Sequence, residues 1–166
     1  MTLILSGTSG LSDVDGSAAT PAIRGTDANT GIFFPAADTI AFSEGGVEAM
    51  RLDSSANLQF NSGYGSVATA YACRAWVNFN GTGTVAIRAS GNVTSITDNG
   101  TGDYTVNFTT AMTDVNYAMV GTSGSAGNAP ASLGTLATNT TSVQVLSNQH
   151  NVGAVDRTFI MVSVIR

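Results

Sequence analysis

The carboxylates are the first residues to consider for chemistry, because glycoside hydrolysis uses two carboxyl groups at a defined separation. The 166-residue chain has only two glutamates, Glu44 and Glu48, and Glu44 falls in a SEGG turn. Asp98, Asp103 and Asp114 lie in or near predicted turns of the second half. Aspartates in turns usually accept hydrogen bonds from their own backbone. We therefore expect no catalytic acid/base pair and predict that the protein is not an enzyme.

Residue types that bind metals are equally sparse. The segment SDVDGS, with Asp13, Asp15 and Gly16, has part of a calcium-loop pattern but lacks the third oxygen ligand and the later Glu. His150 is the only histidine, and Cys73 is the only soft ligand that could join it. A threefold axis could bring three copies of His150 onto one ion, yet a plain loop histidine is the simpler interpretation. We predict no metal and no cofactor.

Composition narrows the class of protein. Charged residues make up 10% of the chain, far below the usual quarter, whereas 43% are hydrophobic and mean hydropathy is +0.17. This is not a disordered composition, and its Thr, Gly and β-branched residues favour an all-β fold. All six basic residues are arginines and the net charge is −5, so no basic stripe exists for nucleic acid. No apolar run approaches the ~20 residues of a membrane span.

The N-terminal residues and the single cysteine indicate the cellular compartment in which the chain is made. The start MTLILSG has no basic region and too short an apolar run for a signal peptide. A single cysteine excludes an intrachain disulfide, and its place in a strand-like run predicts a buried, inert thiol at Cys73. These features suit synthesis in a reducing cytosol.

The first part of the chain, residues 1–66, is predicted to be an extended attachment and oligomerisation region. A loop-like stretch rich in Gly, Asp and Ser precedes short apolar runs at 31–34, 39–42, 47–52 and 57–60, with turns PAAD, SEGG and DSSA between them. Such a β-meander is too thin to be stable alone. Threefold winding into a shaft would bury its apolar side chains between chains: Ile32, Phe34, Ile40, Phe42, Val47, Met50, Leu52, Leu58 and Phe60.

The second part, residues 67–166, is predicted to be an antiparallel β-sandwich, jelly-roll-like, that forms a head domain. Eight strand candidates follow one another with turn signals between them. They are 71–79, 85–89, 93–97, 104–108, 117–120, 133–137, 142–146 and 157–165. The last, TFIMVSVIR, is apolar on both faces, so it is either central in a sheet or buried against a neighbouring subunit.

The first hairpin of this head can be placed in register from its alternation. Matching the apolar faces puts Val77 opposite Ile87 and Trp76 opposite Arg88, where a cation–π contact would form on the outer face. DNGTGD is a strong hairpin signal before Tyr104.

The run NTGIFFPAADTIAFSEGGVEAMRLDSSANLQF, preceded by DGSAATPAIRGTD, resembles a segment common in phage tail fibres and related virion proteins. The stretch AWVNFNGTGTVAIRASGNVTSITDNGTGDYTVNFTTAMTDVNYAMVGT resembles a β-rich terminal module of fibre-type proteins. The two together cover most of the chain. The chain departs from the family where QFNSGYGS replaces the usual GIGT-like run, and no chaperone or peptidase module follows.

The resemblance implies a virion protein that is a homotrimer, made in the host cytoplasm. The first hypothesis is a tail fibre or spike component, whose head contacts other virion proteins or a host surface glycan. The loops 121–130 and 147–155 and the side chains of Trp76, Arg88, Asn128 and His150 are the expected contacts. The second hypothesis is a capsid cement or decoration protein, which the short length, the missing chaperone module and the Met1 start favour. A small glycan-cleaving enzyme is the third, and the missing acid/base pair speaks against it.

Overall fold

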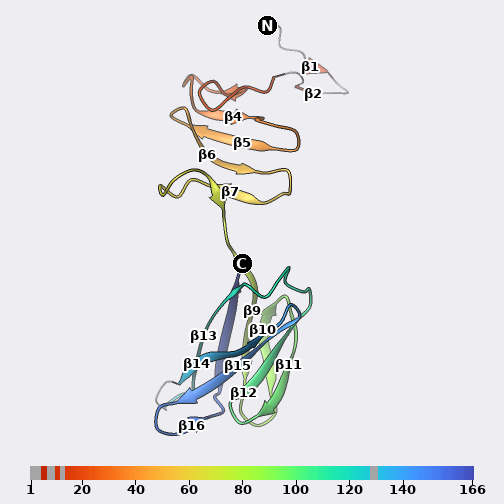
Figure 1. Cartoon of the computed structure of the whole chain (residues 1–166), viewed down its shortest axis with the longest axis vertical. Helices are drawn as coiled ribbons and strands as arrows, with labels where there is room; N and C mark the ends of the chain where they lie inside the picture. The colour runs from red at the N-terminus through yellow and green to blue at the C-terminus, as the bar shows by residue number, and fades with distance from the viewer. Residues whose placement is uncertain (1–4, 7–9, 12–13, 128–130) are drawn as a thin grey trace. The chain divides into compact units, whose positions relative to one another are not determined.

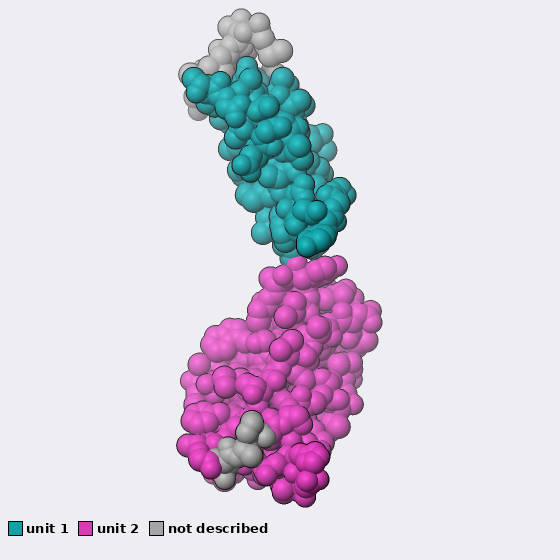
Figure 2. Space-filling model, turned by 90° about the vertical axis from the view of Figure 1, so that its left-hand side faces the viewer, with its two compact units in different colours: residues 1–70 teal, residues 71–166 magenta. Residues whose placement is uncertain are grey.

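The structure is a computed structural model that describes residues 5–6, 10–11, 14–127 and 131–166. The described chain is all-β with antiparallel sheets, as predicted, and contains no helix. It divides into two compact units, Met1–Ala70 and Tyr71–Arg166, which Figure 2 colours separately. The boundary predicted from the sequence lay between residues 66 and 67.

In its described residues, unit 1 has one six-stranded antiparallel sheet besides the short pair β1 (Leu5–Ser6) and β2 (Gly10–Leu11). Its strands follow one another in sequence order, as Figure 1 shows for β4 to β7. They are β3 (Ile23–Arg24), β4 (Gly31–Phe33), β5 (Ile40–Glu44), β6 (Val47–Leu52), β7 (Leu58–Phe60) and β8 (Ala68–Thr69). The meander predicted for residues 31–60 is therefore present, and β3 and β8 extend it at both edges.

The turn between β5 and β6 shows why the SEGG sequence ends one strand and starts the next. Glu44 pairs with Val47, so the loop is only Gly45–Gly46, and both glycines have positive φ (57° and 80°). Two consecutive positive φ values belong to the tight hairpin turn whose twist matches that of the strands, and glycine adopts them without a Cβ clash.

One face of this sheet is covered by the chain's own preceding segment. The N–H of Phe34 donates to the carbonyl of Asp15 (2.8 Å), and the N–H of Gly46 donates to that of Asn29 (2.8 Å). A Cβ on Gly31 would lie 2.1 Å from the carbonyl oxygen of Ile23 and 3.0 Å from Cβ of Pro21. Residue 31 is therefore a glycine because the backbone of Ile23 on the neighbouring strand β3, together with Pro21, leaves no room for a Cβ.

Unit 2 contains two antiparallel sheets. The four-stranded sheet has the order β10-β9-β17-β13 and the other has the order β11-β12-β15-β14, with β16 paired to β15. The bounds are β9 (Cys73–Asn80), β10 (Ala86–Gly91), β11 (Val93–Gly100), β12 (Asp103–Phe108), β13 (Ala118–Gly124), β14 (Ser132–Thr138), β15 (Ser142–Gln149), β16 (Gly153–Ala154) and β17 (Phe159–Ile165). All eight predicted strands of this half are present, whereas the jelly-roll detail stays a prediction.

Side chains from both sheets pack together into one core. Two T-shaped aromatic pairs mark it: Phe79 with Tyr104 (centroids 5.2 Å apart) and Phe108 with Tyr117 (5.9 Å). The buried cluster comprises Ala75, Val77, Phe79, Val93, Tyr104, Val106, Phe108, Met112, Tyr117, Val143, Val145, Ile160, Val162 and Val164. Unit 2 thus closes its own core.

The predicted register of the first head hairpin is wrong, by two residues at Ile87 and by three at Trp76. Ile87 pairs with Phe79 rather than Val77, and Trp76 pairs with Gly91 rather than Arg88. A shift by two keeps the apolar faces matched, so alternation alone cannot detect it. The ladder also shifts between Ile87 and Ala89, which leaves Arg88 without a direct partner on β9. The guanidinium of Arg88 instead lies over the ring of Phe159, 4.9 Å from its centroid.

Three further expectations are corrected by the strand ends. Cys73 is exposed rather than buried, because it is the first residue of β9 and pairs with Ile165 beyond a register shift. The predicted loop 121–130 begins as strand, since Gly121 to Gly124 pair with β17. Similarly, the predicted loop 147–155 contains the end of β15 and all of β16.

The hydroxyl of Tyr104 ties together the loops at one end of unit 2. It lies 2.8 Å from the carbonyl of Gly81 and 2.7 Å from Oδ1 of Asp156, which also accepts the N–H of Gly102 (2.7 Å). Burial, followed by the hydrogen bond to Asp156, raises the pKa of Tyr104 above its usual value.

We predict that Tyr104→Phe lowers the free energy of unfolding by about 1.5–3 kcal/mol, because its partner is a charged acceptor. Tyr117→Phe is the control, since the hydroxyl of Tyr117 faces only the neutral carbonyls of Asn139 and Ser142 (3.0 and 2.9 Å). It should lose about 1 kcal/mol. Urea unfolding of unit 2, followed by near-UV circular dichroism, measures both, and equal losses would contradict the assignment.

Tyr104→Phe should also change how the free energy of unfolding depends on pH. Because the pKa of Tyr104 is raised in the folded state, its contribution is complete below the unfolded value near pH ~10 and is lost as the pH rises beyond it. Tyr104→Phe should therefore lose less stability above that pH than the unchanged protein does.

Candidate functional site

The open face of the unit 1 sheet is the candidate functional site. Cross-strand pairing places Ile32, Phe42, Met50 and Phe60 side by side in one row over β4, β5, β6 and β7. A second row on the same face joins Ile40, Leu52 and Leu58. We call the nine predicted association residues on this side of the sheet the open apolar face: Ile32, Phe34, Ile40, Phe42, Val47, Met50, Leu52, Leu58 and Phe60.

The residues of the open apolar face are largely uncovered within one chain. Val47 is 59% exposed, and Ile40, Met50, Leu52, Leu58 and Phe60 are between 38% and 45% exposed. Ile32, Phe34 and Phe42 are half-buried. In a lone soluble chain, large apolar side chains gathered on one face mark an interaction surface.

Unit 1 has almost no core of its own that could offset this exposure. Among its described residues, only Pro21, Phe33 and Ala41 are apolar and buried, and Thr39 and Ser43 are buried polar neighbours. The apolar residues of the sheet thus point mainly to the side that the chain leaves open. A sheet of this kind gains little from folding alone.

A hollow lies at one end of the open apolar face. It has a volume of about 630 Å³ and is lined by Phe34, Ile40 and Leu52 together with polar turn residues such as Asp38 and Asp53. Its apolar wall continues the second row of the face. It is therefore a place where an apolar side chain from a neighbouring molecule could insert.

The turn between β6 and β7 holds the second row in register. Oδ1 of Asp53 accepts the N–H groups of Ser55 and Asn57 (both 2.9 Å), and Oδ2 accepts Nε2 of Gln59 (2.8 Å). The backbone hydrogen bond from Asn57, above all, lowers the pKa of Asp53. Leu52 and Leu58, which flank this turn, are thereby held opposite each other.

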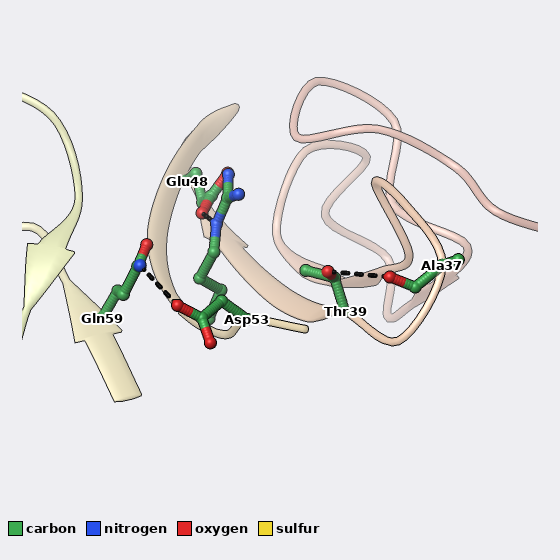
Figure 3. Close-up of polar contacts among 6 residues, drawn as sticks. Ala37, Thr39, Glu48, Asp53 and Gln59 are labelled. Carbon is green, nitrogen blue, oxygen red and sulfur yellow. Dashed lines mark hydrogen bonds and ion pairs between the residues drawn. The ribbon is translucent and has the colours of Figure 1, made fainter. Parts of the chain in front are cut away.

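The other face of the sheet carries the polar contacts, several of which Figure 3 shows. Gln59 reaches Asp53, Thr39 donates to the carbonyl of Ala37 (3.2 Å), and Glu48 forms an ion pair with Arg51. Ala41, Arg51 and Gln59 are cross-strand partners on this face. The sheet therefore separates a polar, self-satisfied side from an apolar, open side.

Of the predicted contact residues of the head, Trp76 and Arg88 share the outer face of one sheet, whereas His150 follows a strand of the other. Trp76 is on the outer face of β9 and 44% exposed, and Arg88 on β10 lies over Phe159. His150 is exposed in the turn between β15 and β16. Asn128 lies outside the described residues.

The carboxylates considered for chemistry are engaged in structural contacts. Asp98 accepts the N–H of Gly100 (3.0 Å), Asp103 accepts the amide of Gln144 (2.8 Å), and Asp114 pairs with Arg166. Glu48 is held by Arg51, whereas Glu44 is at the exposed end of β5. Within the part of the chain that the structure describes, no three His, Cys, Asp or Glu side chains are grouped to hold a metal. The same residues include no helix long and apolar enough to cross a membrane.

Sequence reasoning missed how far the first row extends. Ile23 on β3 pairs with Ile32 and is 44% exposed, and Ala68 on β8 pairs with Phe60. The row therefore runs across all six strands. The signal for Ile23 was weak, because AIRG is a single apolar pair between turn residues.

Comparison with protein-family models, with curated proteins and with solved structures gives no match for this chain.

We predict that Asp53→Ala speeds amide hydrogen exchange at Ser55 and Asn57 several-fold in the full chain, because both amides lose their acceptor. Ser54→Ala removes a hydroxyl from the same turn and should leave both rates unchanged. The turn should also loosen as the pH falls through the folded pKa of Asp53, below its usual value near 3.8. Unchanged exchange in Asp53→Ala would contradict this role of the carboxylate.

Proposed function

We propose that this protein is a structural component of a phage virion, a homotrimeric tail fibre or spike part. Unit 1 associates with its copies through the open apolar face, and unit 2 is the head that contacts other virion proteins or a host surface glycan. The sequence resemblance of residues 29–60 to tail-fibre segments supports the class. The observation that carries the proposal is that unit 1 leaves its apolar side chains open and has almost no core.

The energetics favour association through this face. Burying a Leu, Ile, Met or Phe side chain is worth roughly 1.5–3 kcal/mol, so nine side chains, about half exposed, offer on the order of 10 kcal/mol per chain. The loss of translational and rotational freedom opposes association by about 4–15 kcal/mol. The two amounts are similar. One charge placed in the middle of the face should therefore decide whether the copies stay together.

The two faces of the sheet suit different neighbours. The covered face already has its partner in residues 14–22 of the same chain, for example where the backbone of Asp15 meets that of Phe34. The open face offers no unpaired charge along its two rows, so a like surface from another copy can pack on it without burying an unpaired ion. A homotypic assembly through the open face satisfies this requirement with one sequence.

We predict that the full chain sediments as three copies and that Phe42→Asp and Phe60→Asp sediment as single copies. Phe42 is in the middle of the first row and Phe60 near its end, and either carboxylate would have to be buried without a partner. Thr69→Asp adds the same charge to an exposed position on the opposite face of the same sheet and should keep three copies. Analytical ultracentrifugation measures all four proteins.

Circular dichroism of the variants guards against simple unfolding, because unit 2 has its own core and should keep its near-UV signal. A single copy for the unchanged protein at all concentrations would overturn the proposed role of the open face. Three copies for Phe42→Asp and Phe60→Asp would show that another surface holds the assembly.

The place in the virion is tested by counting copies. Quantitative mass spectrometry of purified virions, with immunogold labelling against unit 2, should find a small number of trimers located at the tail. Label spread over the head in far higher copy number would replace the fibre assignment by capsid cement, and its absence from virions would reject both.

A further inference from the structure

The outer face of the β10-β9-β17-β13 sheet in unit 2 is unexpectedly apolar. Along β17, Ile160, Val162 and Val164 point into the core, so the alternate residues Phe159 and Met161 point outward. Neighbouring strands add to the same face. Its members are Trp76 (44% exposed), Val120 (58%), Phe159 (41%), Met161 (42%) and Ile165 (39%), which we call the Trp76 face.

The register shows that these residues are neighbours. Trp76 on β9 is opposite Ser163 on β17, which is opposite Val120 on β13. Met161 and Phe159 follow on the same side of β17. An open hollow of about 430 Å³ lies beside Phe159 and Met161, where β13 ends at Gly124. The apolar side chains are thus spread over three strands of one face, with Ser163 between Trp76 and Val120, and Asn78 and Thr122 beside Met161.

The outer face of the other unit 2 sheet is polar, which makes the Trp76 face distinctive. Asn107 donates to the hydroxyls of Ser95 (3.2 Å) and Thr97 (3.0 Å). Asn99 donates to the hydroxyl of Thr105 (2.9 Å). These side chains satisfy one another and suit contact with water. Large apolar side chains are exposed elsewhere in unit 2 as well, such as Leu136 on β14 (51%), but on this other face the strands β11 and β12 carry a polar network.

The two aromatic side chains of the Trp76 face are held in place. A Cβ on Gly91 would lie 2.4 Å from Nε1 of Trp76, so the indole lies directly over this glycine. The ring of Phe159 is covered by the guanidinium of Arg88, which also donates to Oδ1 of Asn78 (3.4 Å). Ordered aromatic groups lose little conformational freedom when a partner covers them.

We propose that the Trp76 face of each unit 2 packs against unit 2 of a second copy of this chain. This inference rests on the proposed homotrimer. The second copy is the occupant for two reasons. First, residues 71–166 contain four arginines and four aspartates and are neutral, whereas residues 1–70, with two arginines and seven acidic residues, carry the whole net charge of −5. Neutral heads bring no long-range repulsion to a contact between copies.

The second reason is the size of the face. Its five side chains expose about 400 Å², as large as the largest apolar patch of a typical monomer, yet a stable interface buries about 800 Å² on each partner. An interface of this size is too small to capture a free partner but suffices when the partners are held at millimolar effective concentration. Association through unit 1 supplies that condition, since only residues 70–72 separate β8 from β9.

Trp76 is the only tryptophan of the chain, so its fluorescence reports directly on this face. We predict that acrylamide quenches the unchanged trimer several-fold less than it quenches the single-copy Phe60→Asp protein. Met161→Glu should keep the sedimentation of three copies, because unit 1 is intact, and should raise quenching several-fold. Met161→Gln should raise it less. Thr97→Glu, on the polar outer face of the other sheet, should change neither property.

The outcomes separate the two proposals. A trimer whose Trp76 is quenched as readily as in Phe60→Asp overturns the inference and leaves the proposed function standing. A trimer whose Trp76 is shielded but indifferent to Met161→Glu shows that something other than the matching face covers it, and also overturns the inference. An unchanged protein that sediments as a single copy overturns the proposed function, and this inference with it.

Discussion

A sheet has two faces, and in unit 1 the chain supplies cover for only one. Residues 14–22, which precede β3, lie on the side of Phe33 and Ala41, where Pro21 meets Gly31 and the carbonyl of Asp15 accepts the N–H of Phe34. The turns that follow are too short to provide a second cover, since Gly45–Gly46 joins two strands with no residue to spare. The apolar rows on the other side must therefore be covered by another molecule or remain in water.

Unit 2 meets the same constraint with two sheets. Side chains of β9 and β17 from one sheet and of β12 and β15 from the other fill one core, so the outer faces are free to differ. One outer face carries a hydrogen-bonded network of Asn, Thr and Ser side chains, and the other carries Trp76, Phe159 and Met161. Unit 2 closes a core of its own, so its packing does not depend on a partner that covers its apolar outer face.

The sequence predicted the strands well because local signals determine them here. Val47–Leu52 is a strand with the expected bounds, and the diglycine turn before it is read directly from SEGG. The open apolar face followed from alternation in the same way. What lies between strands was less predictable. The predicted partner of Ile87 was wrong because a shift by two residues preserves alternation. Gly121 to Gly124 were predicted to be a loop from their composition, and they are a strand because they pair with the apolar β17.

Other features had no local signal at all. Arg157 is 4% exposed although arginines are rarely buried, and only its neighbours in space, such as Gln149, explain its place. The hydroxyl of Tyr104 meets Asp156, a residue 52 positions away. Contacts of this kind depend on the packing of complete sheets, so the sequence pattern of a single strand does not predict them.

The distribution of charge in unit 1 is consistent with an interface on its open face. Three of the seven carboxylates of unit 1 are in turns at the two ends of the β5–β6 hairpin: Glu44 at its tip, and Asp38 and Asp53 beside the hollow at the opposite end of these strands. The apolar rows run between these two margins. An apolar centre with charged groups at its rim is the usual anatomy of a protein interface, because rim charges stay hydrated when the centre is buried. In the proposed association, acidic residues at this rim add no desolvation penalty.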